Sequence, residues 1–306
     1  MKNKLLITGS SGFVGRNFIN YIDKNIFSFE FLKKKCLINN NYEIADDINS
    51  IIHLAGKAHD VKNIKSDEYD LVNFEYTVGL YQKFLESNAT VFVFVSSVKA
   101  VCDKISSILY ETNNPNPFTQ YGISKLKAEK YLLNNLKKDK RLFILRPCMI
   151  YGPGNKGNFD LLINFVKKGL PWPLGKFNNK RSFCNVDNLS FVIVNLILNV
   201  KIKTNTYNIA DNNPLSTNEL ISIITNSYNK KNRVLNMPKF LIIFIAKIGD
   251  YIKFPLNSHS LTKLTENFIV SNNKIKATLG SEYNFESEQG LKKLFKKNVW
   301  LFNNWR

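Results

Sequence analysis

Thr8-Gly9-Ser10-Ser11-Gly12-Phe13-Val14-Gly15 is the stretch that decides the fold. It follows a short apolar run at 4–8 and opens an amphipathic stretch at 13–23, so it joins a predicted strand to a predicted helix. In that context Gly9 permits a tight turn, Gly12 lets the backbone approach phosphate oxygens, and Gly15 lets the helix pack closely on a sheet. The amides and partial positive charge of the helix N-terminus suit a dinucleotide pyrophosphate.

Outward from this turn, short apolar runs alternate with amphipathic stretches through the first half of the chain. The later strands are expected at 27–32, 51–55, 91–96 and 142–146, and the later helices at 66–87 and 119–138. Continuous apolar runs are typical of central parallel strands, which are buried on both faces. The pattern therefore predicts an α/β fold with a doubly wound parallel sheet of the Rossmann type.

The regularity of the pattern changes after Tyr151-Gly152-Pro153-Gly154, where Gly, Pro and Asn clusters separate shorter elements. We expect a dinucleotide-binding Rossmann domain at 1–150 and a smaller C-terminal substrate-binding portion at 151–306. Later segments at 182–186 and 206–209 are candidates to return to the sheet region. The region between the second strand and residue 51 is short, which indicates that one crossover is reduced or lost.

The composition narrows the class of protein. A chain of 306 residues that is 44% hydrophobic has ample material for a packed core. The formal charge of +19 comes mostly from Lys scattered among Asn and not from a stripe of Arg and aromatic residues, so nucleic acid is not an expected partner. Four widely spaced cysteines follow no metal-binding pattern, which favours reduced thiols in the cytoplasm and no metal. His53 and His59 lack ligand partners at useful spacing, so structural roles are expected for both.

The two longest apolar runs, at 191–198 and 240–246, fall well short of the roughly 20 residues that span a bilayer. The N-terminus also lacks the apolar stretch and cleavage site of a signal peptide. No transmembrane segment is expected, and both runs predict buried helices. For the region 239–247, a weak contact with a membrane surface is the alternative to core packing or to a wall of the substrate cavity.

Tyr121-Gly122-Ile123-Ser124-Lys125 places a phenol and an ammonium at i and i+4 on one helix face. A free tyrosine loses its proton at about pH 10, but a nearby ammonium and an oxidised nicotinamide both stabilise the phenolate. The pair is therefore suited to exchanging a proton with an oxygen whose carbon gains or loses a hydride.

Several motifs, in the same order along nearly the whole chain, resemble the extended short-chain dehydrogenase/reductase family, also called the NAD-dependent epimerase/dehydratase family. They are the TGxxGFxG turn, Ile52-His53-Leu54-Ala55-Gly56, Ser96-Ser97, the YxxxK pair, and Leu145-Arg146-Pro147 with Tyr151-Gly152-Pro153-Gly154. The resemblance implies a catalytic Ser97, which holds the reacting oxygen, and a catalytic Tyr121 and Lys125. The positions implied for the cofactor are Gly9, Gly12, Phe13, Val14, Gly15, Lys33, Leu54, Ala55, Gly56, Tyr121, Lys125 and Pro147.

The end of the second predicted strand bears on the choice of cofactor. An acidic residue there would serve the ribose hydroxyls of NAD, and basic residues would serve the 2′-phosphate of NADP. Here Lys33-Lys34-Lys35 follows the strand, and Glu30 lies too early to reach the ribose. NADP(H) is therefore favoured and NAD(H) is the alternative, with a lysine-rich composition as the other explanation of the three lysines.

The substrate class comes from the resemblance, which within the family is greatest to the UDP-N-acetylquinovosamine dehydrogenases. These enzymes reduce a UDP-4-keto-6-deoxy-N-acetylhexosamine for surface polysaccharide. The resemblance implies that Asn158 and Arg181 contact the UDP and that Ser97 contacts the sugar. The planar fork of Arg is suited to diphosphate oxygens. The alternatives are a surface salt bridge for Arg181 and a local turn role for Asn158.

Neighbouring reactions of the same family remain to be distinguished. Val98-Lys99 stands where sugar 4,6-dehydratases carry an acid/base Asp-Glu pair, so dehydration is not expected. A UDP-hexose 4-epimerase with tightly bound NAD needs the same three catalytic residues and stays open. A non-catalytic dinucleotide sensor or scaffold is a further alternative, which the retained Tyr/Lys pair disfavours. The sequence is compatible with a homodimer and does not fix the oligomeric state.

Overall fold

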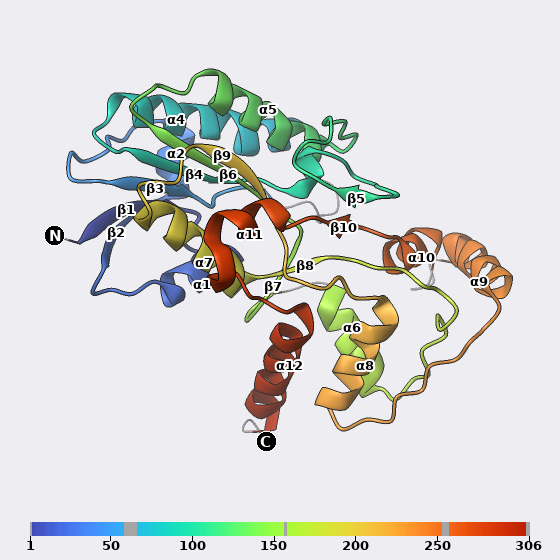
Figure 1. Cartoon of the computed structure of the whole chain (residues 1–306). Helices are drawn as coiled ribbons and strands as arrows, with labels where there is room; N and C mark the ends of the chain where they lie inside the picture. Colours follow the sequence, from blue (N-terminus) through green and yellow to red (C-terminus); the bar gives the residue numbers. More distant parts are fainter. Residues whose placement is uncertain (1, 58–65, 156–157, 253–256, 304–306) are drawn as a thin grey trace.

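The computed structural model describes residues 2–57, 66–155, 158–252 and 257–303. At its centre lies a six-stranded sheet in the order β2-β1-β3-β4-β6-β9, in which every neighbouring pair is parallel (Figure 1). Its strands are β1 (Asn3–Thr8), β2 (Phe27–Leu32), β3 (Ser50–His53), β4 (Val91–Val95), β6 (Arg141–Pro147) and β9 (Asn205–Ile209).

Helices cover both faces of this sheet (Figure 1). On one face lie α1 (Phe13–Tyr21) and α7 (Val186–Leu198), and on the other α2 (Lys34–Asn39), α4 (Tyr76–Glu86) and α5 (Gln120–Asn134). Successive side chains of β1 alternate between the two layers, because Leu5 and Ile7 pack in one buried cluster and Leu6 packs in another. The fold is therefore the predicted doubly wound α/β sheet.

The connection from β2 to β3 is reduced, as the sequence indicates. It contains only the six-residue α2, and β2 forms one edge of the sheet. The helical stretch predicted at 66–87 is also present, but it is divided. It begins as α3 (Ser66–Asp70), passes through a π-helical turn at Leu71–Glu75 and continues as α4.

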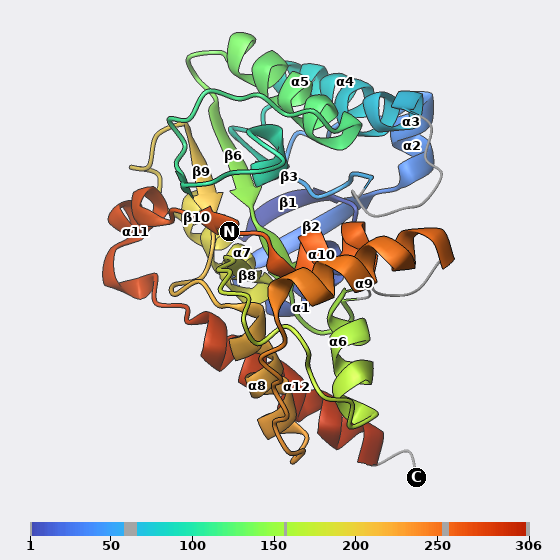
Figure 2. The same cartoon turned by 90° about the vertical axis from the view of Figure 1, so that its right-hand side faces the viewer.

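The remaining elements lie beside the sheet, and most of them come from the second half of the chain (Figures 1 and 2). In chain order they are β5 (Ile108–Leu109), β7 (Met149–Tyr151), α6 (Asn158–Lys167), β8 (Phe183–Asn185), α8 (Thr217–Ser227), α9 (Lys239–Ile252), α10 (Ser258–Thr265), β10 (Ile269–Val270), α11 (Asn273–Leu279) and α12 (Ser287–Asn303). A buried cluster of their own, which includes Trp172 and Phe295, holds several of these elements together.

Both segments that are candidates to return to the sheet region lie in it or beside it. Residues 206–209 join the sheet itself in β9, which pairs with β6. Residues 182–186 do not join the six-stranded sheet, because β8 pairs with β7 in a separate small sheet, but Cys184 packs in the same buried cluster as Leu5. The division of the chain near residue 150 stays a prediction.

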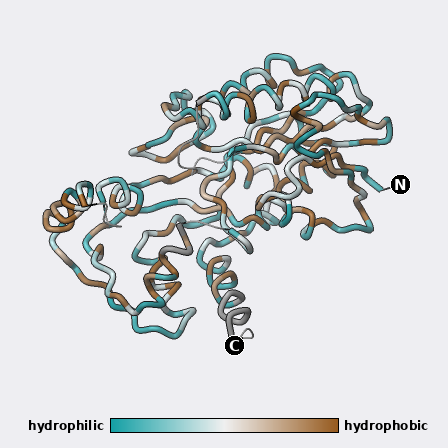
Figure 3. Tube along the Cα trace, turned by 180° about the vertical axis from the view of Figure 1, so that it is seen from behind, coloured by the Kyte–Doolittle hydropathy of each residue, from teal (hydrophilic) through white to brown (hydrophobic). Residues whose placement is uncertain are grey.

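The predictions for the two long apolar runs, at 191–198 and 240–246, have different outcomes. Helix α7, which contains 191–198, is mostly buried against the sheet and against its neighbour α1, as predicted. The prediction of a buried helix at 240–246 is wrong, because α9 lies at the periphery and exposes much of its surface, including Phe240 and Phe244 (Figure 3). In the ranges that the structure describes, no helix is both long enough and apolar enough to cross a membrane.

Candidate active site

The structure places most of the predicted site residues at one edge of the sheet. Strand β1 runs into the glycine turn, β2 into Lys33, β3 into the segment 54–56 and β4 into Ser96 and Ser97, while Pro147 ends β6. All five strands are parallel, so these carboxyl ends meet at the same edge. The chain turns from β2 back to β3 on the other side of β1, and a ligand crevice in such a sheet lies at this reversal.

The glycine turn has the geometry that a dinucleotide phosphate requires. Gly9 has a φ of +69°, and a Cβ built on it would lie 2.6 Å from the Ala55 nitrogen. A Cβ on Gly15 would lie 2.2 Å from the Gly9 oxygen, so only glycine lets α1 approach β1 this closely. Gly12 caps α1 with no side-chain hydrogen bond, which leaves the first-turn amides around Phe13 and Val14 for an anion. These residues fit the pyrophosphate of a nicotinamide dinucleotide.

His53 links Thr8, at the start of this turn, to Thr77 of α4. The Thr77 hydroxyl donates to the Asn73 carbonyl at 2.9 Å, so its oxygen accepts from His53 Nε2, also at 2.9 Å. The other ring nitrogen, Nδ1, then accepts from the Thr8 hydroxyl at 2.7 Å, and Thr8 accepts from the Ala55 amide. Burial, with a smaller contribution from Lys125, lowers the pKa of His53 to about 3. The neutral ring has the structural role expected for it; His59 lies outside the described residues.

Lys125 is a buried cation in contact with the loop after β3. Its Nζ donates to the Val95 carbonyl at 3.0 Å and lies 4.7 Å from the centre of the Phe94 ring. A Cβ built on Gly56 would lie 3.2 Å from the same Nζ, so glycine at this position keeps the space beside the ammonium open. Burial lowers the pKa of Lys125 to about 8, against the opposing effect of Glu129.

The first turn of α5, which carries Tyr121, packs on the turn after β4, which begins at Ser97. A Cβ on Gly122 would lie 2.4 Å from the Lys99 carbonyl oxygen, so this glycine brings the first turn of α5, and with it Tyr121, against the segment 97–100. The Ser97 oxygen accepts from the Lys99 amide at 3.2 Å. Its own hydrogen is therefore directed elsewhere and can be donated to an oxygen of a bound molecule.

Two groups that support this helix were missed by sequence reasoning. Glu129, one turn beyond Lys125, accepts two hydrogen bonds from Arg146 Nε, a third at 2.6 Å from Arg146 Nη2, and a fourth at 2.5 Å from Ser96. Asn73, in the π-helical turn, donates to Ser124 at 3.1 Å. The continuation of YxxxK by a Glu at the next i+4 position was an available signal for Glu129. No comparable pattern marks Asn73.

Of the two residues predicted to contact the UDP, the structure describes the side chain of Arg181 only. Arg181 is not a surface salt bridge: its Nη1 donates to the Lys263 carbonyl, and burial is the main cause that lowers its pKa. Its charge also acts on Lys99, whose own pKa is lowered chiefly by burial. Asp103 and Glu266 oppose this lowering for Lys99, and Glu266 opposes it for Arg181, so both cations already have acidic neighbours within the protein. Asn158 is the first residue of α6, and its side chain is outside the part of the chain that the structure describes.

The cofactor-selecting positions lie at the end of β2. Glu30 forms an ion pair with Lys4 at 2.6 Å, so its carboxylate is engaged with β1 before the strand ends. Lys33 is exposed and caps the start of α2. Neither Glu30 nor Lys33 offers a free acidic group for the ribose hydroxyls of NAD. The preference for NADP(H) stays a prediction.

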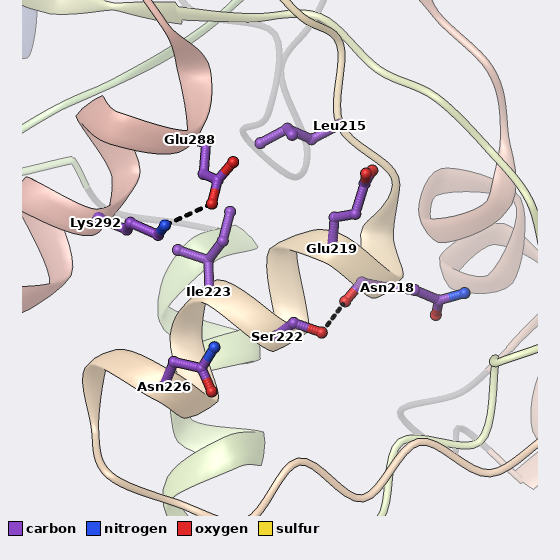
Figure 4. Close-up of a pocket in the computed structure, with 8 residues that line it drawn as sticks. All are labelled: Leu215, Asn218, Glu219, Ser222, Ile223, Asn226, Glu288 and Lys292. Atoms are coloured by element: carbon purple, nitrogen blue, oxygen red, sulfur yellow. Dashed lines mark hydrogen bonds and ion pairs between the residues drawn. The ribbon is translucent and has the colours of Figure 1, made fainter.

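A hollow of about 400 Å³ lies on different elements, between α8 and α12 (Figure 4). Some of its polar groups pair with one another, because Lys292 pairs with Glu288 at 2.5 Å and the Ser222 hydroxyl donates to the Asn218 carbonyl. It contains none of the residues that the sequence assigns to catalysis. We therefore place the candidate active site at the carboxyl edge of the sheet.

Comparison with known proteins identifies the family of the chain. Residues 5–210 match the model of the NAD dependent epimerase/dehydratase family. A UDP-glucose 4-epimerase of Vibrio cholerae is 29% identical over 99% of this chain and 96% of its own length. A dTDP-4-dehydrorhamnose reductase from Bacillus anthracis, solved with NADP, has a TM-score of 0.74 at 19% identity over 97% of this chain and all of its own. A UDP-glucuronic acid 4-epimerase from Bacillus cereus, solved with NAD, has a TM-score of 0.73 at 18% identity over 98% of this chain and 99% of its own.

The fold and the matched family define the class: a nicotinamide-dependent enzyme on a Rossmann sheet. The chain belongs to the NAD dependent epimerase/dehydratase family. Its relatives include both epimerases and reductases, so family membership does not choose between the two reactions.

Proposed function

We propose that this protein is a nucleotide-sugar reductase that uses NADP(H) to reduce a UDP-4-keto-6-deoxy-N-acetylhexosamine at C4, as UDP-N-acetylquinovosamine dehydrogenases do. The observation that carries the proposal is the position of the Lys125 ammonium. It lies beside Gly56 and at hydrogen-bond distance from the Val95 carbonyl, next to the loop that packs on the glycine turn. This position of Lys125 supports the proposal that Tyr121 and Lys125 exchange a proton beside a bound nicotinamide dinucleotide.

Three side chains have separate roles in the proposed reaction. Ser97 donates a hydrogen bond to the C4 oxygen, Tyr121 gives its phenolic proton to that oxygen as negative charge develops, and Lys125 stabilises the resulting phenolate. The reduced nicotinamide, when bound, supplies the hydride that C4 receives. One hydride and one proton convert the ketone into a secondary alcohol. Oxidation is the same sequence in reverse.

Recognition of the nucleotide is proposed for Arg181 and Asn158. The guanidinium of Arg181 is largely buried and its planar fork is suited to the diphosphate of UDP. We extend the proposal to Asn158 because it opens α6 directly after the Gly-rich segment. Val98 and Lys99 provide no carboxylate to move the protons that dehydration requires.

A 4-epimerase with tightly bound NAD is the second candidate, and one specific finding favours it. The Vibrio cholerae relative that matches 99% of this chain is a UDP-glucose 4-epimerase. That reaction uses the same Ser, Tyr and Lys groups in both directions, with rotation of the keto sugar between the two hydride transfers.

The discriminating experiment uses the purified full chain. It is denatured to release any bound nucleotide, which is identified, and the native protein is incubated with candidate UDP-4-keto sugars and either NADPH or NADH. Stoichiometric consumption of added NADPH with formation of the C4 alcohol supports the reductase. Retained NAD together with interconversion of UDP-hexoses, and no net oxidation of NADPH, would establish the epimerase instead. Turnover by neither route would favour a dinucleotide sensor.

A further inference from the structure

Helix α9 has two apolar faces, and the fold covers only one of them. Ile242, Ala246 and Gly249 are buried, and the first two pack in the same cluster as Leu261 of α10. The opposite face carries apolar side chains at i, i+4, i+8 and i+11, which is helical spacing for a second stripe. Its members, with their exposed fractions, are Phe240 (75%), Phe244 (60%), Ile248 (43%) and Tyr251 (90%).

This concentration is unusual for the molecule. Of the nineteen large apolar side chains that are exposed in the described part of the chain, six lie on this one helix of 14 residues. In Figure 3, α9 lies at the edge of the structure, and much of its trace has the brown colour of hydrophobic residues. Scattered exposed apolar residues are ordinary, but a contiguous stripe marks an interaction surface.

The charge around the stripe indicates the kind of partner. Between residues 230 and 265 the sequence has seven Lys or Arg residues and a single acidic residue, Asp250. The Asp250 carboxylate accepts hydrogen bonds from the backbone and the hydroxyl of Ser258. Lys239 and Lys247 flank Phe240 and Phe244 on the helix itself. A basic and aromatic helix face is complementary to a surface that is both negatively charged and apolar beneath.

An anionic lipid bilayer has both properties. A second copy of the chain would bring the same excess of positive charge against itself, which is unfavourable. The helix is about 21 Å long at 1.5 Å per residue, less than the hydrocarbon thickness of about 30 Å, so it would lie along the surface. We propose that α9 docks this protein on an anionic membrane surface, with Phe240, Phe244 and Tyr251 inserted at the headgroup boundary and the lysines against the phosphates. This goes beyond the proposed reaction and does not depend on it.

The test is sedimentation of the full chain with vesicles. One set contains equal parts of phosphatidylglycerol and phosphatidylcholine, and the other contains phosphatidylcholine alone. We expect binding to the anionic set that is at least about tenfold stronger than to the neutral set and that weakens as salt rises. The double variant Phe240→Ser, Phe244→Ser should bind the anionic vesicles about tenfold less well.

Matched controls separate α9 from the general charge of the protein. Leu198→Ser with Val200→Ser removes two exposed apolar side chains at the end of α7, and should bind as the wild type does. Lys239→Glu with Lys247→Glu, both on α9, should weaken binding, whereas Lys201→Glu with Lys203→Glu, in the segment between α7 and β9, should weaken it much less. Thermal unfolding of each variant checks that it folds.

A measurement on the unaltered chain keeps the proposal falsifiable if a variant fails to fold. Hydrogen exchange of peptides covering 239–252 should slow on addition of the anionic vesicles, while peptides covering 186–198 stay unchanged. The proposal is overturned if the wild type does not bind anionic vesicles, if the α9 and control variants bind equally, or if exchange in 239–252 is unaffected. It is also overturned if the α9 stripe instead makes a dimer, seen as a wild-type dimer that the Phe240→Ser, Phe244→Ser variant abolishes.

Discussion

Helices α5 and α9 depart from the usual distribution of residues in opposite ways. Helix α5 buries polar groups, among them Ser124, Lys125 and Glu129. Helix α9 exposes apolar groups, among them Phe240 and Tyr251. Each of these three polar groups has a hydrogen-bond partner inside the protein, whereas the outer apolar stripe of α9 is left exposed.

The difference teaches where to look for two kinds of function. Burying a charge is costly unless it is paired, so a buried and paired Lys or Glu indicates a position held for chemistry or for the support of chemistry. Exposing a large apolar side chain costs little to the folded state alone, so a stripe of them indicates a contact with something else. The five predictions below test this contrast.

Replacing the phenol of α5 should have the largest effect. Tyr121→Phe keeps the ring but removes the proton donor, so turnover should fall about a thousandfold while dinucleotide binding is retained. The measurement is kcat with saturating NADPH and UDP-4-keto sugar. Tyr131→Phe is the control, because its hydroxyl lies on the same helix and accepts from Gln82 away from the site. If Tyr121→Phe turned over at the wild-type rate, the phenol would not be the proton donor, and the polar residues of α5 would have only a structural role.

Breaking the buried ion pair of α5 should be the next largest effect, on stability. Glu129→Gln keeps the side-chain shape but leaves the Arg146 guanidinium without its counter-charge, at a cost of about 3–5 kcal/mol in the free energy of unfolding. Lys127→Met, on the same helix, breaks an ion pair with Asp70 that is partly exposed and should cost at most about 1 kcal/mol. Denaturant titration measures both. Equal losses in the two variants would mean that burial does not distinguish the pairs.

The buried ammonium of α5 should show itself in the pH dependence. Because the pKa of Lys125 is about 8 in the folded protein, the rate of ketone reduction should fall as pH rises through that value and the ammonium loses its charge. In Lys125→Arg the guanidinium stays charged, so the residual activity should lose this alkaline fall. Profiles of kcat/KM against pH provide the check, and the same fall in both enzymes would assign it to another group.

The same pKa has a consequence for stability, with a defined sign. The folded protein releases the Lys125 proton at about pH 8 and the unfolded chain only near the ordinary value of 10.5, so unfolding takes up a proton between these values. The stability of the wild type should therefore rise relative to that of Lys125→Met over this interval. Denaturant titrations of the two proteins at matched pH values measure the difference.

The smallest effect is expected from α9. Phe240→Ser with Phe244→Ser should change the free energy of unfolding by no more than about 0.5 kcal/mol, because neither side chain is covered. Ile193→Ser in α7, where the side chain is fully buried, should cost at least about 3 kcal/mol. A large loss from the α9 variant would show that its outer stripe packs within the protein.

The sequence alone predicted the sheet and the edge where the candidate site lies, because both depend on local pattern. The strand at 27–32 and the glycine turn before α1 follow from apolar runs and turn chemistry within a few residues. The ion pair between Glu129 and Arg146 was missed, because it joins two elements that meet only in the folded sheet. The exposure of α9 was missed for a related reason. The hydropathy of a residue indicates that its side chain is apolar. It does not indicate which face of a helix the rest of the chain covers.

The order of the strands also has a consequence for synthesis. Strand β6 leaves the ribosome long before β9, which covers its outer edge, and the intervening residues take about 3–12 seconds at 5–20 residues per second. During that interval a buried, apolar strand presents an open row of amides and carbonyls to the cytosol or to other nascent chains. Chains arrested before β9 emerges should therefore associate with holdase chaperones more strongly than chains arrested after it.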